Sequence, residues 1–252
     1  MKLLRFKGIL LLLICIAISA KAQYEVPYTG DRVALAKRDK NAVLKRMCEM
    51  NGISFPPKQV FLRSFKRERT LELWARLDNE NKYVLLKVYK NCQLSGILGP
   101  KREEGDMQVP EGFYYINEFN PTSDYFLSLG INYPNKSDQL RSFATNKGGD
   151  IYIHGHCSSI GCIPITDDGI KEVYLMCLYA SDYGQIAIPV HIFPFKLTFE
   201  NLRRAKREYA DRKDLIRFWE NDLFPGYRKF EIHRRPPEVQ INDDGSYYWE
   251  FY

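Results

Sequence analysis

Short apolar segments that alternate with polar residues recur between residues 60 and 193, and they restrict this chain to a β-rich core. These segments are rich in β-branched and aromatic residues, as β-strands are. They span residues 60–62, 70–77, 83–89, 113–116, 151–153 and 186–193. The run Asp78-Asn79-Glu80-Asn81 predicts a turn between the second and third. Pro189 favours a position near a sheet edge or a bulge for the segment 186–193.

Segments with helical periodicity lie beside and within this core. Residues 31–50, 167–179 and 199–219 carry apolar residues near helical spacing. Asn51-Gly52 should end the first helix, and Pro225-Gly226 and Pro236-Pro237 should interrupt the chain after the last. The pattern predicts an α+β protein. Its parts are a helical N-terminal flank (23–57), a β-rich domain (58–198) and a C-terminal extension (199–252) with a closing hairpin around residues 243–245.

The first residues indicate export. Lys2, Arg5 and Lys7 precede an uncharged, mostly apolar run of 13 residues, and Ala20-Lys21-Ala22 offers a cleavage site after Ala22. We therefore expect a signal peptide at residues 1–22 and a mature protein in the periplasm or cell envelope. A membrane anchor is the alternative, but a spanning helix needs about 20 apolar residues. No second long apolar run follows, so no membrane span is expected after cleavage.

The charge balance changes with this cleavage. The segment 1–22 holds four of the 37 basic residues and none of the 31 acidic ones, so its removal lowers the net charge from +6 to +2. A nearly balanced mature chain argues against nucleic acid as a partner.

The mature chain would keep an odd number of cysteines: Cys48, Cys92, Cys157, Cys162 and Cys177. An exported protein with an odd number leaves at least one thiol unpaired. The other possibility is that all five are reduced and buried, since free cysteine is a common core residue.

The stretch from residue 151 to residue 166 carries the chemistry. An alternating strand leads to His154, and Cys162 follows a loop of small residues. A thiol needs a base to become a nucleophilic thiolate, and an imidazole eight residues upstream can supply it. Gly161 would let a substrate carbonyl approach the backbone, whose N–H groups could hold an oxyanion. We interpret Cys162 as the nucleophile and His154 as its base.

Two other interpretations of this stretch stay open. His154, His156, Cys157 and Cys162 are soft ligands close in sequence and could bind a metal. A disulfide between Cys157 and Cys162 would instead be an inactive state of the same site. His156 is either a second base or an ordinary loop histidine.

The same stretch resembles the catalytic motif of the L,D-transpeptidases, the YkuD-domain family. Its hallmarks are a strand that ends in His-Gly and a downstream Ser-x-Gly-Cys, matched here by His154-Gly155 and Ser159-Ile160-Gly161-Cys162. Residues 99–101, 105–106 and 109–114 resemble the family's hairpin before the active site. The resemblance covers about residues 58–198. It implies a core of mixed sheets or a sandwich, with Ser159, Gly155 and Gly161 near the oxyanion or substrate.

The resemblance also implies a function. The substrate would be a peptidoglycan stem peptide, with an acyl-enzyme on Cys162 and no metal or organic cofactor. The short interval between His154 and Cys162, Pro164, and the C-terminal extension resemble the YafK-like branch, part of which cuts peptide links. We expect amide hydrolysis slightly ahead of transfer. Transfer would form cross-links or attach a protein to the wall, and a non-catalytic wall-binding module is a second alternative.

Overall fold

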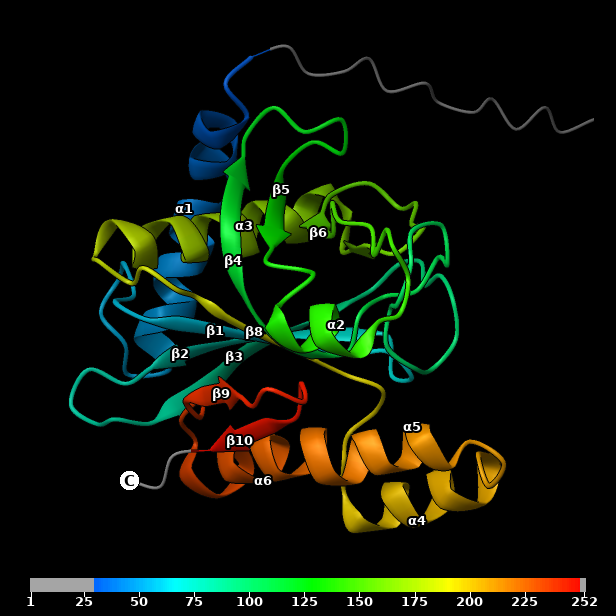
Figure 1. Cartoon of the computed structure of the whole chain (residues 1–252). Coiled ribbons are helices and arrows are strands. Elements are labelled where there is room, and N and C mark those ends of the chain that lie inside the picture. Colours follow the sequence, from blue (N-terminus) through cyan, green and yellow to red (C-terminus); the bar gives the residue numbers. More distant parts are fainter. Residues whose placement is uncertain (1–29, 250–252) are drawn as a thin grey trace, which may run out of the picture.

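The computed structural model describes residues 30–249, so the expected signal peptide (1–22) lies outside the described residues (Figure 1). One curled sheet forms the centre, in the strand order β3-β2-β1-β8-β4-β5-β6-β7. Its strands are β1 (Val60–Phe65), β2 (Thr70–Arg76), β3 (Tyr83–Lys90), β4 (Gly112–Asn120), β5 (Ser128–Ile131), β6 (Tyr152–His154), β7 (Ile163–Pro164) and β8 (Pro189–Phe193). Strand β4 links the two halves of the sheet, because its start pairs with β8 and its end with β5.

Two helices pack against one another on the sheet and close the main core. They are α1 (Arg32–Met50) and α3 (Thr166–Asp182). Asp31 caps α1 by accepting the N–H groups of Val33 and Ala34. Leu44 of α1 and Val173 of α3 are fully buried in the same apolar cluster as residues of β1 and β2. The apolar stripes read from the sequence therefore face this core.

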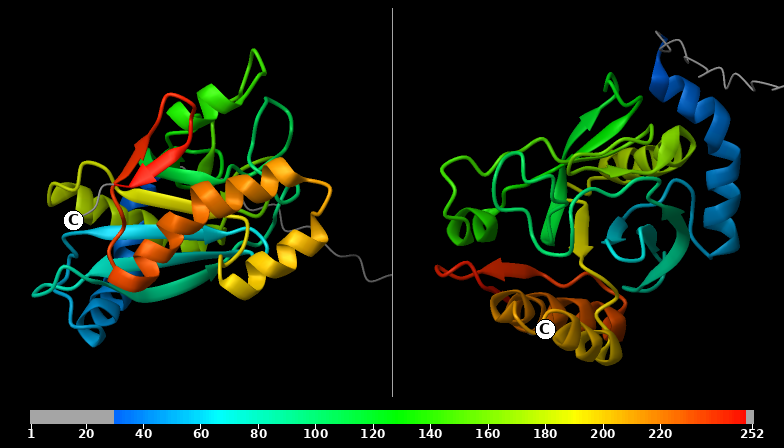
Figure 2. Two further views of the ribbon diagram at one scale, coloured as in Figure 1. Left: turned by 60° about the horizontal axis from the view of Figure 1, so that its bottom comes forward. Right: turned by 90° about the vertical axis from the view of Figure 1, so that its right-hand side faces the viewer.

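The C-terminal extension forms a second layer below the sheet (Figures 1 and 2). It consists of α4 (Phe199–Glu208), α5 (Lys213–Arg217), the π-helical turn η1 (Phe218–Leu223), α6 (Phe224–His233) and the hairpin β9 (Val239–Ile241) with β10 (Tyr247–Trp249). A short helix, α2 (Lys136–Arg141), lies between β5 and β6 in the chain. Phe65 and Phe193 of the sheet pack with Trp219 and Tyr227 of the extension in a second apolar cluster. Within residues 30–249, no helix has the length and apolar character that a membrane crossing requires.

The sequence predicted much of this correctly. The α+β class, the helices at 31–50 and 167–179, and the tail hairpin as far as residue 249 are confirmed. The expected break at Pro225-Gly226 is wrong, because the backbone stays helical from α5 through the π-helical turn η1 into α6, and both residues lie within this run. The edge position expected from Pro189 is also wrong. Strand β8 is central, and Pro189 is its first residue, where a missing N–H disturbs the sheet least.

A buried ion pair joins the sheet, the loop before β4 and the extension. Lys66 Nζ lies 3.0 Å from Glu111 Oε1, and both side chains are almost completely buried. The same ammonium donates to the carbonyls of Gly99 (2.6 Å) and Val109 (2.9 Å). Trp219 Nε1 donates to Glu111 Oε2 at 2.8 Å. Burial lowers the pKa of Lys66, so the paired carboxylate is needed to keep the charge.

Replacing Glu111 with alanine should therefore destabilise the protein strongly. The change leaves a buried ammonium without its counter-charge, for which we expect a loss of about 3–5 kcal/mol in the free energy of unfolding. Urea denaturation measures this loss. The matched control is Glu80→Ala, which removes a surface ion pair with Lys82 whose side chains are both more than half exposed. That control should change stability by less than about 1 kcal/mol. Equal stability of the two variants contradicts the assigned role of Glu111.

Candidate active site

His154 ends strand β6, and Cys162 directly precedes the neighbouring strand β7. Strands β6 and β7 run parallel, with Ile153 beside Ile163, so Cys162 lies beside the start of β6 and His154 at its end. The backbone N–H of Tyr152 donates to Cys162 Sγ at 3.4 Å, which ties the thiol to β6. No hydrogen bond joins the thiol to the imidazole within the described chain, and such bonds often tighten only when substrate binds.

The imidazole of His154 is buried and held in its neutral form. The side chain is 1% exposed, and Tyr125 covers it with a ring centroid 4.4 Å away. His154 Nδ1 lies 2.5 Å from the carbonyl oxygen of Gly155, a bond in which the ring N–H donates. This tautomer leaves Nε2 as the proton acceptor. Burial lowers the pKa of His154 below its ordinary value, so the ring is neutral near pH 7.

The thiol of Cys162 rests in its protonated form. Its pKa is raised, first by burial and further by the charge of Asp150. The N–H of Tyr152 and the charge of Lys101 act in the opposite direction. The thiol donates to the carbonyl of Asp150 at 3.5 Å. A thiol with a raised pKa attacks only after a base takes its proton, so Cys162 depends on a neighbouring acceptor.

The loop between the two strands is organised by Ser159. Its hydroxyl donates to the carbonyl of Cys162 (2.8 Å), accepts the N–H of Gly161 (3.1 Å) and lies 3.1 Å from the hydroxyl of Ser95. Gly161 has φ +142°, and an added Cβ would lie 3.2 Å from the carbonyl oxygen of Gln108. Only glycine combines this backbone angle with this close approach.

Gly155 and His156 are fixed from the start of α3. An added Cβ at Gly155 would lie 2.5 Å from Asp167 Oδ1, so a side chain does not fit there. The N–H of Gly155 donates to the carbonyl of Leu127. His156 is exposed, its N–H donates to Asp167 Oδ1 at 2.7 Å, and its ring lies 3.8 Å from the same carboxylate. Asp167 thus holds the beginning of the loop between β6 and β7.

The structure pairs Cys157 with Cys92 in a disulfide whose Cα atoms lie 5.6 Å apart. The predicted alternative of a Cys157–Cys162 disulfide is therefore wrong, because Cys157 already has another partner. Because its sulfur is bonded to Cys92, Cys157 also cannot serve as a ligand in the predicted metal site. Cys48, Cys162 and Cys177 are free, which confirms the expectation of an unpaired thiol.

The loop before β4 contributes residues to which the sequence assigned no role. The carboxylate of Asp106 accepts the N–H groups of Arg102 (2.8 Å), Glu103 (3.1 Å) and Gln108 (3.0 Å). It also lies 2.7 Å from Lys101 Nζ. Asp106 therefore shapes the loop that brings Lys101 near the thiol. In the sequence, the Gly105-Asp106 pair is part of the resemblance to the family's hairpin. Only the structure shows that the Asp106 carboxylate binds three backbone N–H groups of the loop.

The sequence of this chain is similar to those of known proteins. The family pattern described as YkuD, the L,D-transpeptidase catalytic domain, matches residues 74–192. The chain is 41% identical over 184 residues to the Escherichia coli K12 protein named "Putative L,D-transpeptidase YafK", covering 72% of this chain and 70% of that protein.

Two solved structures are also similar. The helical cell shape determining protein Pgp2 of Campylobacter jejuni has a TM-score of 0.44 and 16% identity, covering 81% of this chain and 80% of that one. Bd1075 of Bdellovibrio bacteriovorus has a TM-score of 0.39 and 22% identity, covering 69% of this chain and 62% of that one.

Iodoacetamide should label one cysteine of the folded mature protein, Cys162. Cys48 and Cys177 are completely buried, and burial raises the pKa of both thiols, that of Cys48 to about 11. Because the pKa of Cys162 is also raised, its labelling rate should still increase as the pH passes 9. Peptide mass spectrometry after timed labelling measures this. The Cys162→Ala variant, the control, should take up label only after denaturation. A labelling rate that is already constant at pH 7 contradicts the protonated resting thiol.

Proposed function

The chain belongs to the YkuD family of L,D-transpeptidases, and from this premise we propose a cysteine-dependent enzyme that acts on peptidoglycan stem peptides through an acyl-enzyme at Cys162. The observation that carries the proposal is a free, partly exposed cysteine directly before β7, the strand that pairs with β6, which ends in a buried, neutral imidazole. The substrate lies outside the cytoplasmic membrane, so the proposal includes export to the periplasm or envelope. It requires no metal or organic cofactor.

The first step is attack by the thiolate. Nε2 of His154 takes the proton of Cys162, and Sγ forms a bond to the acyl carbon of the third residue of the stem peptide. The bond from Nδ1 to the carbonyl of Gly155 orients the ring and stabilises the imidazolium that forms. Collapse of the tetrahedral intermediate breaks the amide bond, and His154 returns its proton to the leaving amine. An acyl-enzyme on Cys162 remains.

The oxyanion of this intermediate is assigned to the backbone N–H of Cys162, because the N–H of Gly161 already donates to the hydroxyl of Ser159. Gly161 has no side chain to exclude a carbonyl oxygen, and Ser159 holds the turn through both residues. The N–H of Gly155 is already bonded to Leu127, so we assign Gly155 to close packing beside His154.

Hydrolysis of the acyl-enzyme is the proposed main outcome. Transfer requires an acceptor amine to reach the acyl group before water does. The catalytic loop is held by the Cys92–Cys157 disulfide and by the contact between Ser95 and Ser159. A loop fixed at two points has little freedom to admit a bulky acceptor. Cross-link formation, or attachment of a protein to the wall, is the alternative outcome of the same chemistry.

The Cys162→Ser variant should lose nearly all turnover and stay folded, because a hydroxyl beside the same base is a much poorer nucleophile. The assay is release of product from tetrapeptide wall fragments, followed by mass spectrometry. Ser158→Ala, a change at an exposed side chain of the same loop, serves as the control and should stay active. EDTA should leave the wild type unaffected. Full activity of Cys162→Ser would disprove the mechanism.

Hydrolysis and transfer can be separated by their products. The mature protein is given tetrapeptide fragments with and without a free acceptor amine, and separately wall material that carries a covalently linked protein or a cross-link. We expect cleaved peptides and released protein, with little effect of added acceptor. If new cross-links dominate and no linked material is released, the enzyme is a transferase and the hydrolase proposal is wrong.

A further inference from the structure

A pocket of about 310 Å³ lies between the loop before β4 and the C-terminal extension. Arg102 and Gln108 line it from the loop, and Arg212, Asp214 and Phe218 line it from the segment around α5. Arg141 of α2 also lines it. The pocket thus gathers three guanidinium groups and one carboxylate from three separate parts of the chain.

The pocket shares its loop with the candidate active site. Gln108 lines the pocket, and its carbonyl oxygen is the atom that Gly161 approaches closely beside Cys162. Lys101, whose charge lowers the pKa of the Cys162 thiol, directly precedes Arg102. The side chain of Gln108 also accepts the N–H of Ile97 at 3.0 Å and joins the two arms of the loop. A peptide bound at the thiol could therefore extend along this loop into the pocket.

The three arginines differ in how fully they are paired. Arg141 is engaged, because its guanidinium makes two bonds of 2.9 and 2.8 Å to the carboxylate of Asp222. Among the described residues, the guanidinium of Arg102 makes one long contact of 3.4 Å with Asp138 and lies over the ring of Phe218, 5.7 Å from its centroid. Burial raises the pKa of Asp138 to about 6, which weakens it as a counter-charge in mildly acidic solution.

Arg212 is the second incompletely paired arginine. Its Nε lies 4.0 Å from Asp214, and about half of its side chain is exposed. A guanidinium offers five N–H donors in a planar fork that matches a carboxylate. Arg102 and Arg212 therefore keep donors that can turn toward an anion in the pocket.

We propose that this pocket is a subsite for a carboxylate of the substrate, held by Arg102 from the catalytic domain and Arg212 from the extension. The inference rests on the proposed function and deepens it. The preferred substrate is a stem peptide with a free carboxylate near the amide that is cut, and amidation of that carboxylate weakens binding. The extension thus contributes to substrate selection.

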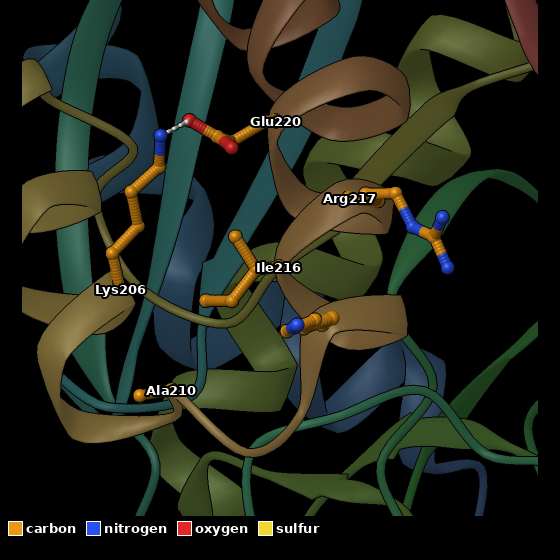
Figure 3. A pocket seen from close by; sticks show the side chains of 6 residues that line it. Lys206, Ala210, Ile216, Arg217 and Glu220 are labelled. Carbon is orange, nitrogen blue, oxygen red and sulfur yellow. Dashed lines mark ion pairs between the residues drawn. The ribbon is translucent and has the colours of Figure 1, made fainter.

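A matched control lies on the other side of α5. Figure 3 shows a second pocket, of about 420 Å³, in which Lys206 Nζ lies 2.6 Å from Glu220. Lys213 lines this second pocket and follows Arg212 directly in the chain. Lys213→Glu therefore makes the same change in net charge as Arg212→Glu, but outside the proposed subsite.

The test compares kcat and KM of the wild type, Arg212→Glu, Arg212→Lys and Lys213→Glu on a stem tetrapeptide and on its carboxyl-amidated analogue. For the tetrapeptide, Arg212→Glu should raise KM about tenfold with little change in kcat, which corresponds to about 1.4 kcal/mol of binding. Arg212→Lys should lie between Arg212→Glu and the wild type, and Lys213→Glu should match the wild type. For the amidated analogue, all four proteins should have similar KM values. An equal effect of Arg212→Glu and Lys213→Glu, or an equal effect on both substrates, overturns the subsite.

Binding without turnover separates this inference from the proposed function. Calorimetry measures the affinity of the tetrapeptide for Cys162→Ala and for Cys162→Ala with Arg212→Glu. Weaker binding to the second protein, of about tenfold, supports the subsite even if the reaction proves to be different. Equal affinities, or no binding to either protein, overturn it. The activity of Cys162→Ser bears only on the mechanism.

Discussion

The buried pair of Lys66 and Glu111 is the contact on which the arrangement of the site depends most. A charge in the interior is stable only when it is paired and its hydrogen bonds are satisfied. Lys66 meets this condition by binding the carbonyls of Gly99 and Val109, the two ends of the loop that carries Lys101. Glu111 meets the same condition by accepting a hydrogen bond from the indole N–H of Trp219. One desolvated ion pair therefore fixes the sheet, the loop beside the thiol and the extension together.

Burial also determines the charge states of the proposed catalytic pair, Cys162 and His154. Desolvation disfavours charge on both groups, so it lowers the pKa of His154 and raises that of Cys162. In the proposed mechanism, the resting state is a neutral thiol and a neutral imidazole, and charges form only when the thiolate attacks. The carbonyl of Gly155 is already in position to stabilise the imidazolium, while Ser159 keeps the turn before Cys162 rigid.

The extension is bound to the catalytic domain by more than apolar contacts. Arg141 binds Asp222 through both terminal nitrogens, and Asn135 donates to the hydroxyl of Tyr247. Together with Trp219, these contacts connect α2 and the loop before β4 to the helices below the sheet. A segment held at three points can contribute residues to a substrate site without a hinge between them, and the proposed pairing of Arg212 with Arg102 depends on this rigidity.

Local pattern in the sequence determined the α+β class, most of the longer elements, the strand–loop order of His154 and Cys162, and the family resemblance. These depend on neighbours a few residues apart, which a single sequence displays. Strands β5 and β7 and the partner of Cys157 were not predicted. A strand of two to four residues is stable only through its neighbours, and the disulfide spans 65 residues. Which thiol stays free and how far each charge is buried follow from long-range contacts, and only the tertiary structure decides them.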